Sequence, residues 1–193
     1  MRLSVRFQQA LAWAAELHAE QVRKGTNVPY IAHLLAVTSL VLEHGGNEDE
    51  AIAALLHDAV EDQGGESTLR EIERRFGPDV AHIVLGCTDA MSVPKPPWRA
   101  RKEAYLAHLT QASASVRLVS AADKLHNART ILADYRRVGE AVWDRFEGGR
   151  QGTLWYYRAL VHTLRTPDPS PLVEELARVV ATIEALAGGE EKP

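Results

Sequence analysis

SVRLVSAADKLHNARTILADY, residues 115–135, is the stretch that decides the fold. Its first half is apolar over most of a helical circumference, which is typical of a helix buried on all sides. The flanking sequence repeats apolar residues every three to four positions and contains no convincing alternating run. The sequence therefore predicts an all-α, bundle-like domain built around this segment.

Glycines and prolines separate the other predicted helices. We expect helices over residues 31–43 and 48–62, each ending at a pair of glycines, and a further helix over residues 99–109. Thr68 and Glu71 have the spacing of a capping box, which predicts a helix start there. Ser170 is a predicted N-cap with Pro171 in the first turn of the last helix.

Length, composition and charge restrict the class of protein. A chain of 193 residues can bury one good core, so we expect a single domain over residues 1–187 and a flexible tail at 188–193. The net charge of −4, without a basic tract, argues against a nucleic-acid partner. Cys87 is the only cysteine, which excludes a cysteine-based zinc site.

No signal-type or membrane-spanning segment is visible, so we expect a cytoplasmic protein without a membrane partner. The oligomeric state stays open.

The stretch ALLHDAVEDQGG, residues 54–65, carries a cluster of polar side chains. On a continuous helix, four-residue spacing places His57 beside Glu61 and Asp58 beside Asp62. Carboxylates near the C-terminus of a helix oppose its dipole and need a compensating positive charge. A metal ion would supply that charge.

Two further ligands are expected from other helices. His33 interrupts the apolar run PYIAHLLAV, and Asp123 interrupts the buried run VSAADKLHNART. A buried carboxylate needs a cation or several hydrogen bonds. The predicted set of two imidazoles and two carboxylates, without thiolate, suits Mn²⁺, Fe²⁺ or Zn²⁺. Taken singly, His33 could be a core histidine and Asp123 an internal cap or salt-bridge partner.

Four stretches occur in an order shared with a known family. They are RKGTNVPYIAH, ALLHDAVED, VLGCTDA and AADKLHNART, and LWYYRAL extends the match towards the C-terminus. The combination resembles the HD superfamily of metal-dependent phosphohydrolases, and more closely the hydrolase domain of RelA/SpoT homologues and the single-domain small alarmone hydrolases. The resemblance implies an HD-type helical fold and hydrolysis of a phosphorylated purine nucleotide.

The resemblance also implies roles for individual residues. Glu61 and Asp62 would be the catalytic acids that orient the attacking water or remove its proton. The implied substrate contacts, near the base, ribose and phosphates, are Arg23, Lys24, Asn127 and Thr130. The plain alternatives are a solvated helix end for the acids and ordinary helix-terminal charge or local hydrogen bonding for the others. Tyr156, Tyr157 and Arg158 could reach the phosphates, although tyrosines at helical spacing more often belong to a core.

The expected function is Mn²⁺-dependent removal of the 3′-pyrophosphate from ppGpp or pppGpp, with metal-bound hydroxide as the nucleophile. An alternative keeps the site and changes the substrate to ppApp or pppApp, or to NADPH losing its 2′-phosphate. A third hypothesis is a nucleotide sensor without turnover. The sequence GCTDA departs from the family pattern, and no synthetase segment is present, so alarmone synthesis is not expected.

Overall fold

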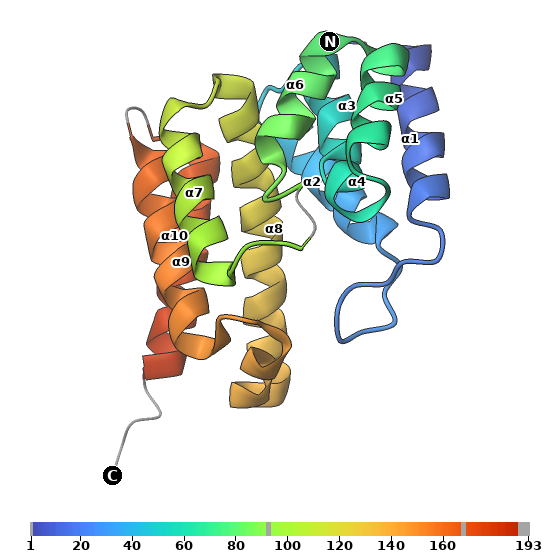
Figure 1. The fold of residues 1–193 in the computed structure, drawn as a ribbon. Helices are drawn as coiled ribbons and strands as arrows, with labels where there is room; N and C mark the ends of the chain where they lie inside the picture. Colours follow the sequence, from blue (N-terminus) through green and yellow to red (C-terminus); the bar gives the residue numbers. More distant parts are fainter. Residues whose placement is uncertain (1, 92–93, 167–168, 189–193) are drawn as a thin grey trace.

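The computed structural model describes residues 2–91, 94–166 and 169–188 (Figure 1). Within these residues the chain is all-helical, and the β structure is limited to an isolated bridge between Val22 and Pro29. The predicted all-α class is therefore confirmed. No helix in the described ranges combines the length and apolar character needed to cross a membrane.

The helices follow one another through short connections. In chain order they are α1 (Val5–Leu17), α2 (Ile31–Glu43), α3 (Glu48–Leu56), α4 (Ala59–Asp62), α5 (Glu66–Phe76), α6 (Pro78–Cys87), α7 (Trp98–Gln111), α8 (Ala114–Val138), the 3₁₀ helix η1 (Gly139–Arg145), α9 (Gly149–Arg165) and α10 (Pro171–Gly188). The predicted bounds of α2 are confirmed. The predicted cap of α10 is also confirmed, since Ser170 Oγ accepts a hydrogen bond from the Val173 amide at 3.3 Å.

Helix α8 is the centre of the molecule. It contacts α2, α3 and α6 on one side and α10 on the other, between the blue-to-green and the orange-to-red parts of the chain (Figure 1). Val119, Ala122, Leu125 and Ala128 of this helix are fully buried. Truncating a buried leucine such as Leu125 to alanine typically lowers the free energy of unfolding by about 2–5 kcal/mol. Because α8 packs against helices on both sides, its buried side chains hold the two sides together.

The predicted continuous helix over residues 48–62 is wrong. Helix α3 ends at Leu56 and the short α4 begins at Ala59, so His57 and Asp58 lie at the break. Polar partners favour the break: His57 Nδ1 lies 2.8 Å from the carbonyl oxygen of Ala54, and Asp58 accepts a hydrogen bond from Tyr30. Helix α4 then ends before Gly64, which has a positive φ of 124°.

The predicted flexible tail over residues 188–193 falls mostly outside the described residues. Gly188 is the last residue of α10, and residues 189–193 lie outside the described part of the chain. The predicted capping box at Thr68 and Glu71 is also wrong. Helix α5 begins at Glu66, and the Thr68 hydroxyl donates instead to the carbonyl oxygen of Gln63 at 2.6 Å.

Candidate active site

The four predicted metal ligands converge from three places in the fold. Helix α2 supplies His33, the break between α3 and α4 supplies His57 and Asp58, and α8 supplies Asp123. His33 Nε2 lies 3.5 Å from Asp58 Oδ2 and 3.3 Å from Asp123 Oδ1. His57 Nε2 lies 3.1 Å and 3.7 Å from the same two oxygens. His33, His57 and Asp58 thus offer ligand atoms within 4.8 Å of one another, and Asp123 lies beside the two histidines.

The two histidines present unsatisfied nitrogens to this cluster. Both Nε2 atoms are buried without a hydrogen-bond partner in the described structure. Their Nδ1 atoms are engaged, at 2.8 Å from the Ala54 carbonyl oxygen for His57 and at 2.7 Å from His126 Nδ1 for His33. A metal-ligating histidine typically uses its second nitrogen for such a bond. An unpaired buried polar atom is costly, so the donor set fits a divalent cation.

Charge in the cluster is balanced between the imidazoles and the carboxylates. Burial opposes ionisation of Asp58, but His57 and His33 hold its pKa well below the usual range. Burial likewise opposes ionisation of Asp123, and Lys124 is the largest influence holding its pKa well below the usual range. Burial disfavours a charged His57, yet Asp58 raises the pKa of that imidazole overall. Because a metal is bound by the neutral imidazole, binding of a cation to His57 would release any proton that the ring carries.

Surrounding side chains hold the carboxylates in place. Tyr30 donates its hydroxyl to Asp58 Oδ2 at 2.6 Å, and Lys124 Nζ donates to Asp123 Oδ2 at 2.6 Å. Asn127 donates to the other oxygen of Asp123. Fixed partners of this kind orient ligands and commonly strengthen metal binding.

The two predicted catalytic acids lie in different surroundings. Glu61 accepts a hydrogen bond from Lys95 Nζ at 2.7 Å and lines a cavity beside the cluster. Asp62 lies at the surface and accepts from Gln21 at 2.8 Å. Partial desolvation, with the nearby charges of Asp58 and Glu61, raises the pKa of Asp62. Glu61 is therefore the acid that faces the cavity in the described structure.

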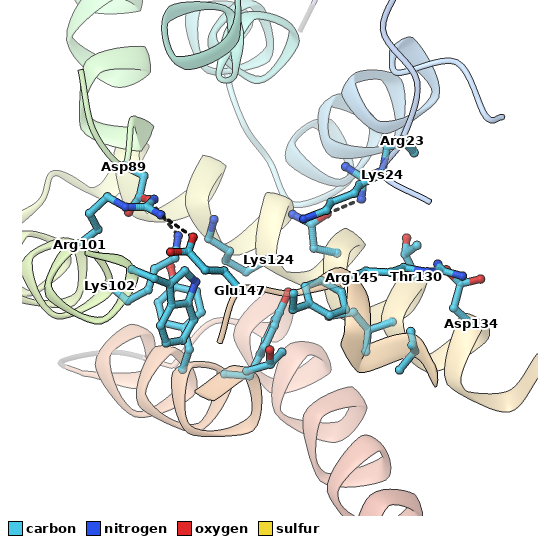
Figure 2. Close-up of a pocket in the computed structure, with 18 of the residues that line it drawn as sticks. Arg23, Lys24, Asp89, Arg101, Lys102, Lys124, Thr130, Asp134, Arg145 and Glu147 are labelled. Atoms are coloured by element: carbon cyan, nitrogen blue, oxygen red, sulfur yellow. Dashed lines mark hydrogen bonds and ion pairs between the residues drawn. The ribbon is translucent and has the colours of Figure 1, made fainter. Parts of the chain in front are cut away.

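The cavity has a volume of about 470 Å³, and the predicted substrate contacts line it (Figure 2). These are Arg23, Lys24, Asn127 and Thr130. Arg23 donates to Asn127 Oδ1 at 2.5 Å, and its guanidinium carbon lies 5.6 Å from the centre of the Tyr30 ring. The residues predicted near the nucleotide thus share one cavity, which adjoins the cluster through Tyr30, Lys124 and Asn127.

Tyr156 and Tyr157 also line the cavity, whereas Arg158 does not belong to it. Arg158 pairs with Glu184 of α10 in a separate groove between α9 and α10. Both tyrosines are largely buried, so they serve the core and the cavity wall together.

Sequence reasoning missed most of the wall that the second half of the chain supplies. It includes Trp98, Arg101, Lys102, Arg145 and Phe146. The signals were basic residues after the proline-rich loop, in PKPPWRARK, and an arginine before the glycine connector. Isolated charges of this kind are ordinary on exposed helices, so only the fold separates them from a solvated surface.

Cationic groups gather at both ends of the cavity. Figure 2 shows Arg23 and Lys24 near Arg145 at one end, Arg101 and Lys102 at the other, and Lys124 between them. Carboxylates pair with several of these cations: Arg145 Nη1 lies 2.6 Å from Asp134, and Lys102 Nζ lies 3.0 Å from Asp89. The cavity beside the cluster is therefore suited to an anionic ligand.

Comparison with known proteins agrees with this geometry. The family model of the HD domain matches residues 10–154, and the chain therefore belongs to the HD-domain family. The expected family is confirmed.

The most similar relatives include proteins with a named activity. The chain is 42% identical to the guanosine-3′,5′-bis(diphosphate) 3′-pyrophosphohydrolase MESH1 of Xenopus tropicalis over 126 residues, which cover 64% of this chain and 68% of that protein. It is 36% identical to the human MESH1 with the same coverage of both proteins. It is 38% identical to the pyrophosphohydrolase of Aquifex aeolicus over 64% of this chain but 17% of that longer protein.

A solved structure extends the likeness to nearly the whole fold. It is that of a metazoan orthologue of SpoT described as hydrolysing ppGpp, with a TM-score of 0.78 and 25% identity. The superposition covers 95% of this chain and 98% of that chain. A structure from Listeria monocytogenes matches with a TM-score of 0.71 and 28% identity, over 78% of this chain and 97% of that one.

Proposed function

We propose that this protein is a metal-dependent hydrolase that removes the 3′-pyrophosphate from ppGpp or pppGpp, giving GDP or GTP and pyrophosphate. The observation that carries the proposal is the cluster of His33, His57, Asp58 and Asp123 beside a cationic cavity of about 470 Å³. The similarity to proteins named for this activity supports it.

His33, His57, Asp58 and Asp123 would hold the divalent cation, which we propose to be Mn²⁺, with Fe²⁺ or Zn²⁺ as alternatives. When bound, the cation lowers the pKa of water and stabilises negative charge on phosphoryl oxygens. The carboxylates are oriented for this task by Tyr30 and Lys124, as described above.

Glu61 is the proposed acceptor of the proton from the attacking water. It lines the cavity, and Lys95 holds one of its oxygens. Asp62, with its raised pKa, is the proposed second acid. The oxygen of water bonds to the phosphorus of the 3′ ester, and the bond from that phosphorus to O3′ breaks. O3′ takes up a proton from solvent water to become the 3′-hydroxyl, and the phosphorus leaves within pyrophosphate.

Arg23, Lys24, Asn127 and Thr130 are the proposed nucleotide contacts. Arg23 presents a flat guanidinium held by Asn127 and Tyr30, which suits stacking on a purine. Lys24 and Arg145 supply positive charge for phosphates at the same end. The hydroxyl of Thr130 donates to the His126 carbonyl oxygen at 3.0 Å, so its oxygen remains able to accept a bond from a ribose hydroxyl.

The proposal is tested by incubating the purified protein with ppGpp and Mn²⁺ and measuring release of pyrophosphate. We expect release that stops when EDTA is added and returns with Mn²⁺. A panel with ppApp, pppApp and NADPH distinguishes the adenosine and 2′-phosphatase alternatives by their kcat/KM. Tight binding of ppGpp without product, under conditions where a known hydrolase works, would instead support a sensor. We further propose a cytoplasmic location, which fractionation of the native cells tests.

A further inference from the structure

Lys102 lies at one end of the cavity, and Lys124 lies between the two ends. Lys102 Nζ lies 3.0 Å from Asp89 Oδ2, and Arg101 pairs with the same oxygen. Two cations therefore share one carboxylate oxygen, and the nearby carboxylate of Glu61 is paired with Lys95, so this end keeps one positive charge without a partly buried carboxylate of its own. Glu147 is near Arg101, at 3.2 Å, but its side chain is 64% exposed and its charge is screened by water.

Lys124 connects this end of the cavity to the cluster. Its Nζ lies 2.6 Å from Asp123 Oδ2, while the other oxygen of Asp123 faces His33 Nε2 at 3.3 Å. The side chains of Lys102 and Lys124 are each only 16% exposed. Partly buried ammonium groups are screened less than surface ones, so they attract an anion more strongly.

Tyr156 forms the wall beneath these lysines. Lys102 Nζ lies 5.1 Å from the centre of its ring. The residue is 6% exposed, and its hydroxyl is buried without a hydrogen-bond partner in the described structure. Burial raises the pKa of Tyr156 to about 12, so the hydroxyl keeps its proton near neutral pH and can donate it. An unpaired buried donor is costly and is satisfied by an acceptor such as a phosphoryl oxygen.

We propose that Lys102, Lys124 and Tyr156 form a subsite for the second phosphate of the substrate's 3′ chain, which makes the cavity select a diphosphate over a monophosphate ester. The inference rests on the proposed function. The proposed nucleoside contacts lie at the Arg23 end of the cavity, and Lys124, which donates to the proposed ligand Asp123, lies between that end and Lys102 (Figure 2). A phosphate chain whose reacting phosphorus lies beside the cluster would therefore continue towards Lys102. The same lysines would stabilise the charge of the departing pyrophosphate.

The first test measures binding of the product group itself. Inorganic pyrophosphate and inorganic phosphate are titrated into the Mn²⁺-loaded protein by calorimetry. We expect Lys102→Gln to weaken pyrophosphate binding by about 10- to 100-fold, as for loss of a hydrogen bond to a charged group. We expect Tyr156→Phe, which keeps the ring, to weaken it by about 3- to 10-fold. Binding of inorganic phosphate should change less than twofold in both variants.

A matched control removes the same charge elsewhere. Arg70 of α5 is 65% exposed and pairs with Glu66, away from the cavity, so Arg70→Gln should leave both affinities unchanged. Thermal unfolding of each variant verifies that the fold is intact. Equal weakening of phosphate and pyrophosphate binding, or no weakening of either, would overturn the subsite.

The second test measures selection between substrates. We compare ppGpp with the analogue that carries a single 3′-phosphate. Both variants should lose kcat/KM for ppGpp by the factors given above and retain it for the monophosphate, which reduces the preference of the enzyme. Equal losses on both substrates would overturn the proposal. If the unaltered protein releases no pyrophosphate from ppGpp while the binding experiment succeeds, the proposed function fails and the diphosphate subsite stands.

Discussion

The two halves of the molecule contribute to the site in different ways. The half from α1 to α6 provides His33, His57 and Asp58, which lie on helices or at a buried break, and α8 completes their cluster with Asp123. The half from α7 to α10 provides most of the cationic and aromatic cavity wall, including Lys102 and Tyr156, and the first half adds Arg23, Lys24 and Tyr30. The first half fixes a few atoms within hydrogen-bond distances, whereas the second shapes a larger volume. Changes in the first should alter metal binding and the chemical step, and changes in the second should alter substrate choice.

The largest expected effect comes from removing a ligand of the first half. Asp58→Ala deletes one of the two carboxylates that contact His33 and His57, and with it one of the four proposed metal ligands. Loss of several kcal/mol of charge stabilisation corresponds to a fall of about 1,000-fold or more in metal-dependent turnover. Mn²⁺ binding by calorimetry and pyrophosphate release measure the two parts of this effect. Asp144→Ala, at an exposed position of η1, is the matched control. A variant of Asp58 that keeps Mn²⁺ and full turnover would contradict the assignment.

Substituting Glu61 tests whether this carboxylate acts in the chemical step or in binding the metal. Glu61→Gln keeps the size of the side chain and removes its ability to take a proton, so kcat should fall by about 100- to 10,000-fold. Mn²⁺ affinity should stay within a few-fold of the original because Glu61 is outside the ligand cluster. The loss of kcat in Asp62→Asn, measured in parallel, shows how much each of the two acids contributes to turnover. If Glu61→Gln weakens Mn²⁺ binding and leaves kcat at saturating Mn²⁺ unchanged, Glu61 is a metal ligand and not the proton acceptor.

The contrast between the halves also explains what the sequence could predict. His33 and Asp123 were visible because each interrupts an apolar helical run, and a buried polar group needs a partner. Because each buried polar group needs a partner, the four candidate ligands were predicted to converge. In the structure the two histidines lie next to both carboxylates. The helical class followed from apolar periodicity alone.

Features that depend on contacts distant in sequence were not predictable. At the break that holds His57 and Asp58, Tyr30 of a distant segment donates a hydrogen bond to Asp58, and no local pattern reveals that contact. The structure forms a capping box at Asn47 and Glu50 of α3. Several other sites in the sequence have the same spacing, and only packing decides among them. The cavity wall joins residues from α7, η1 and α9 that share no spacing, so a single sequence gives no reason to group them.

His126 offers a finer test within the cluster. The ring of His57 is held by a backbone carbonyl, whereas that of His33 is held by the side chain of His126, so only the second support can be removed by substitution. His126→Phe preserves a planar ring and deletes the nitrogen, and Mn²⁺ affinity should fall by about 10- to 100-fold. His82→Phe, at an exposed position of α6, should leave the affinity unchanged. Unaltered Mn²⁺ affinity in His126→Phe would show that His33 is oriented by packing alone.

The smallest effect concerns the contact that joins the first half to α8. A Cβ atom at Gly86 of α6 would lie 2.6 Å from Cγ2 of Val116 in α8, and Val116 is buried and β-branched, so it cannot turn aside easily. Overpacking of this kind costs about 1–3 kcal/mol, and the better helix propensity of alanine offsets up to about 1 kcal/mol. We therefore expect Gly86→Ala to lower the free energy of unfolding by about 1–2 kcal/mol, measured with urea in the presence of EDTA to remove stabilisation by bound metal. Gly188→Ala is the matched control, since no atom lies within 4 Å of its added Cβ and stability should not fall. If both variants are as stable as the unaltered protein, α6 and α8 must be able to move apart and accept the added methyl group. The packing of α6 against α8 would then be less rigid than the 2.6 Å contact suggests.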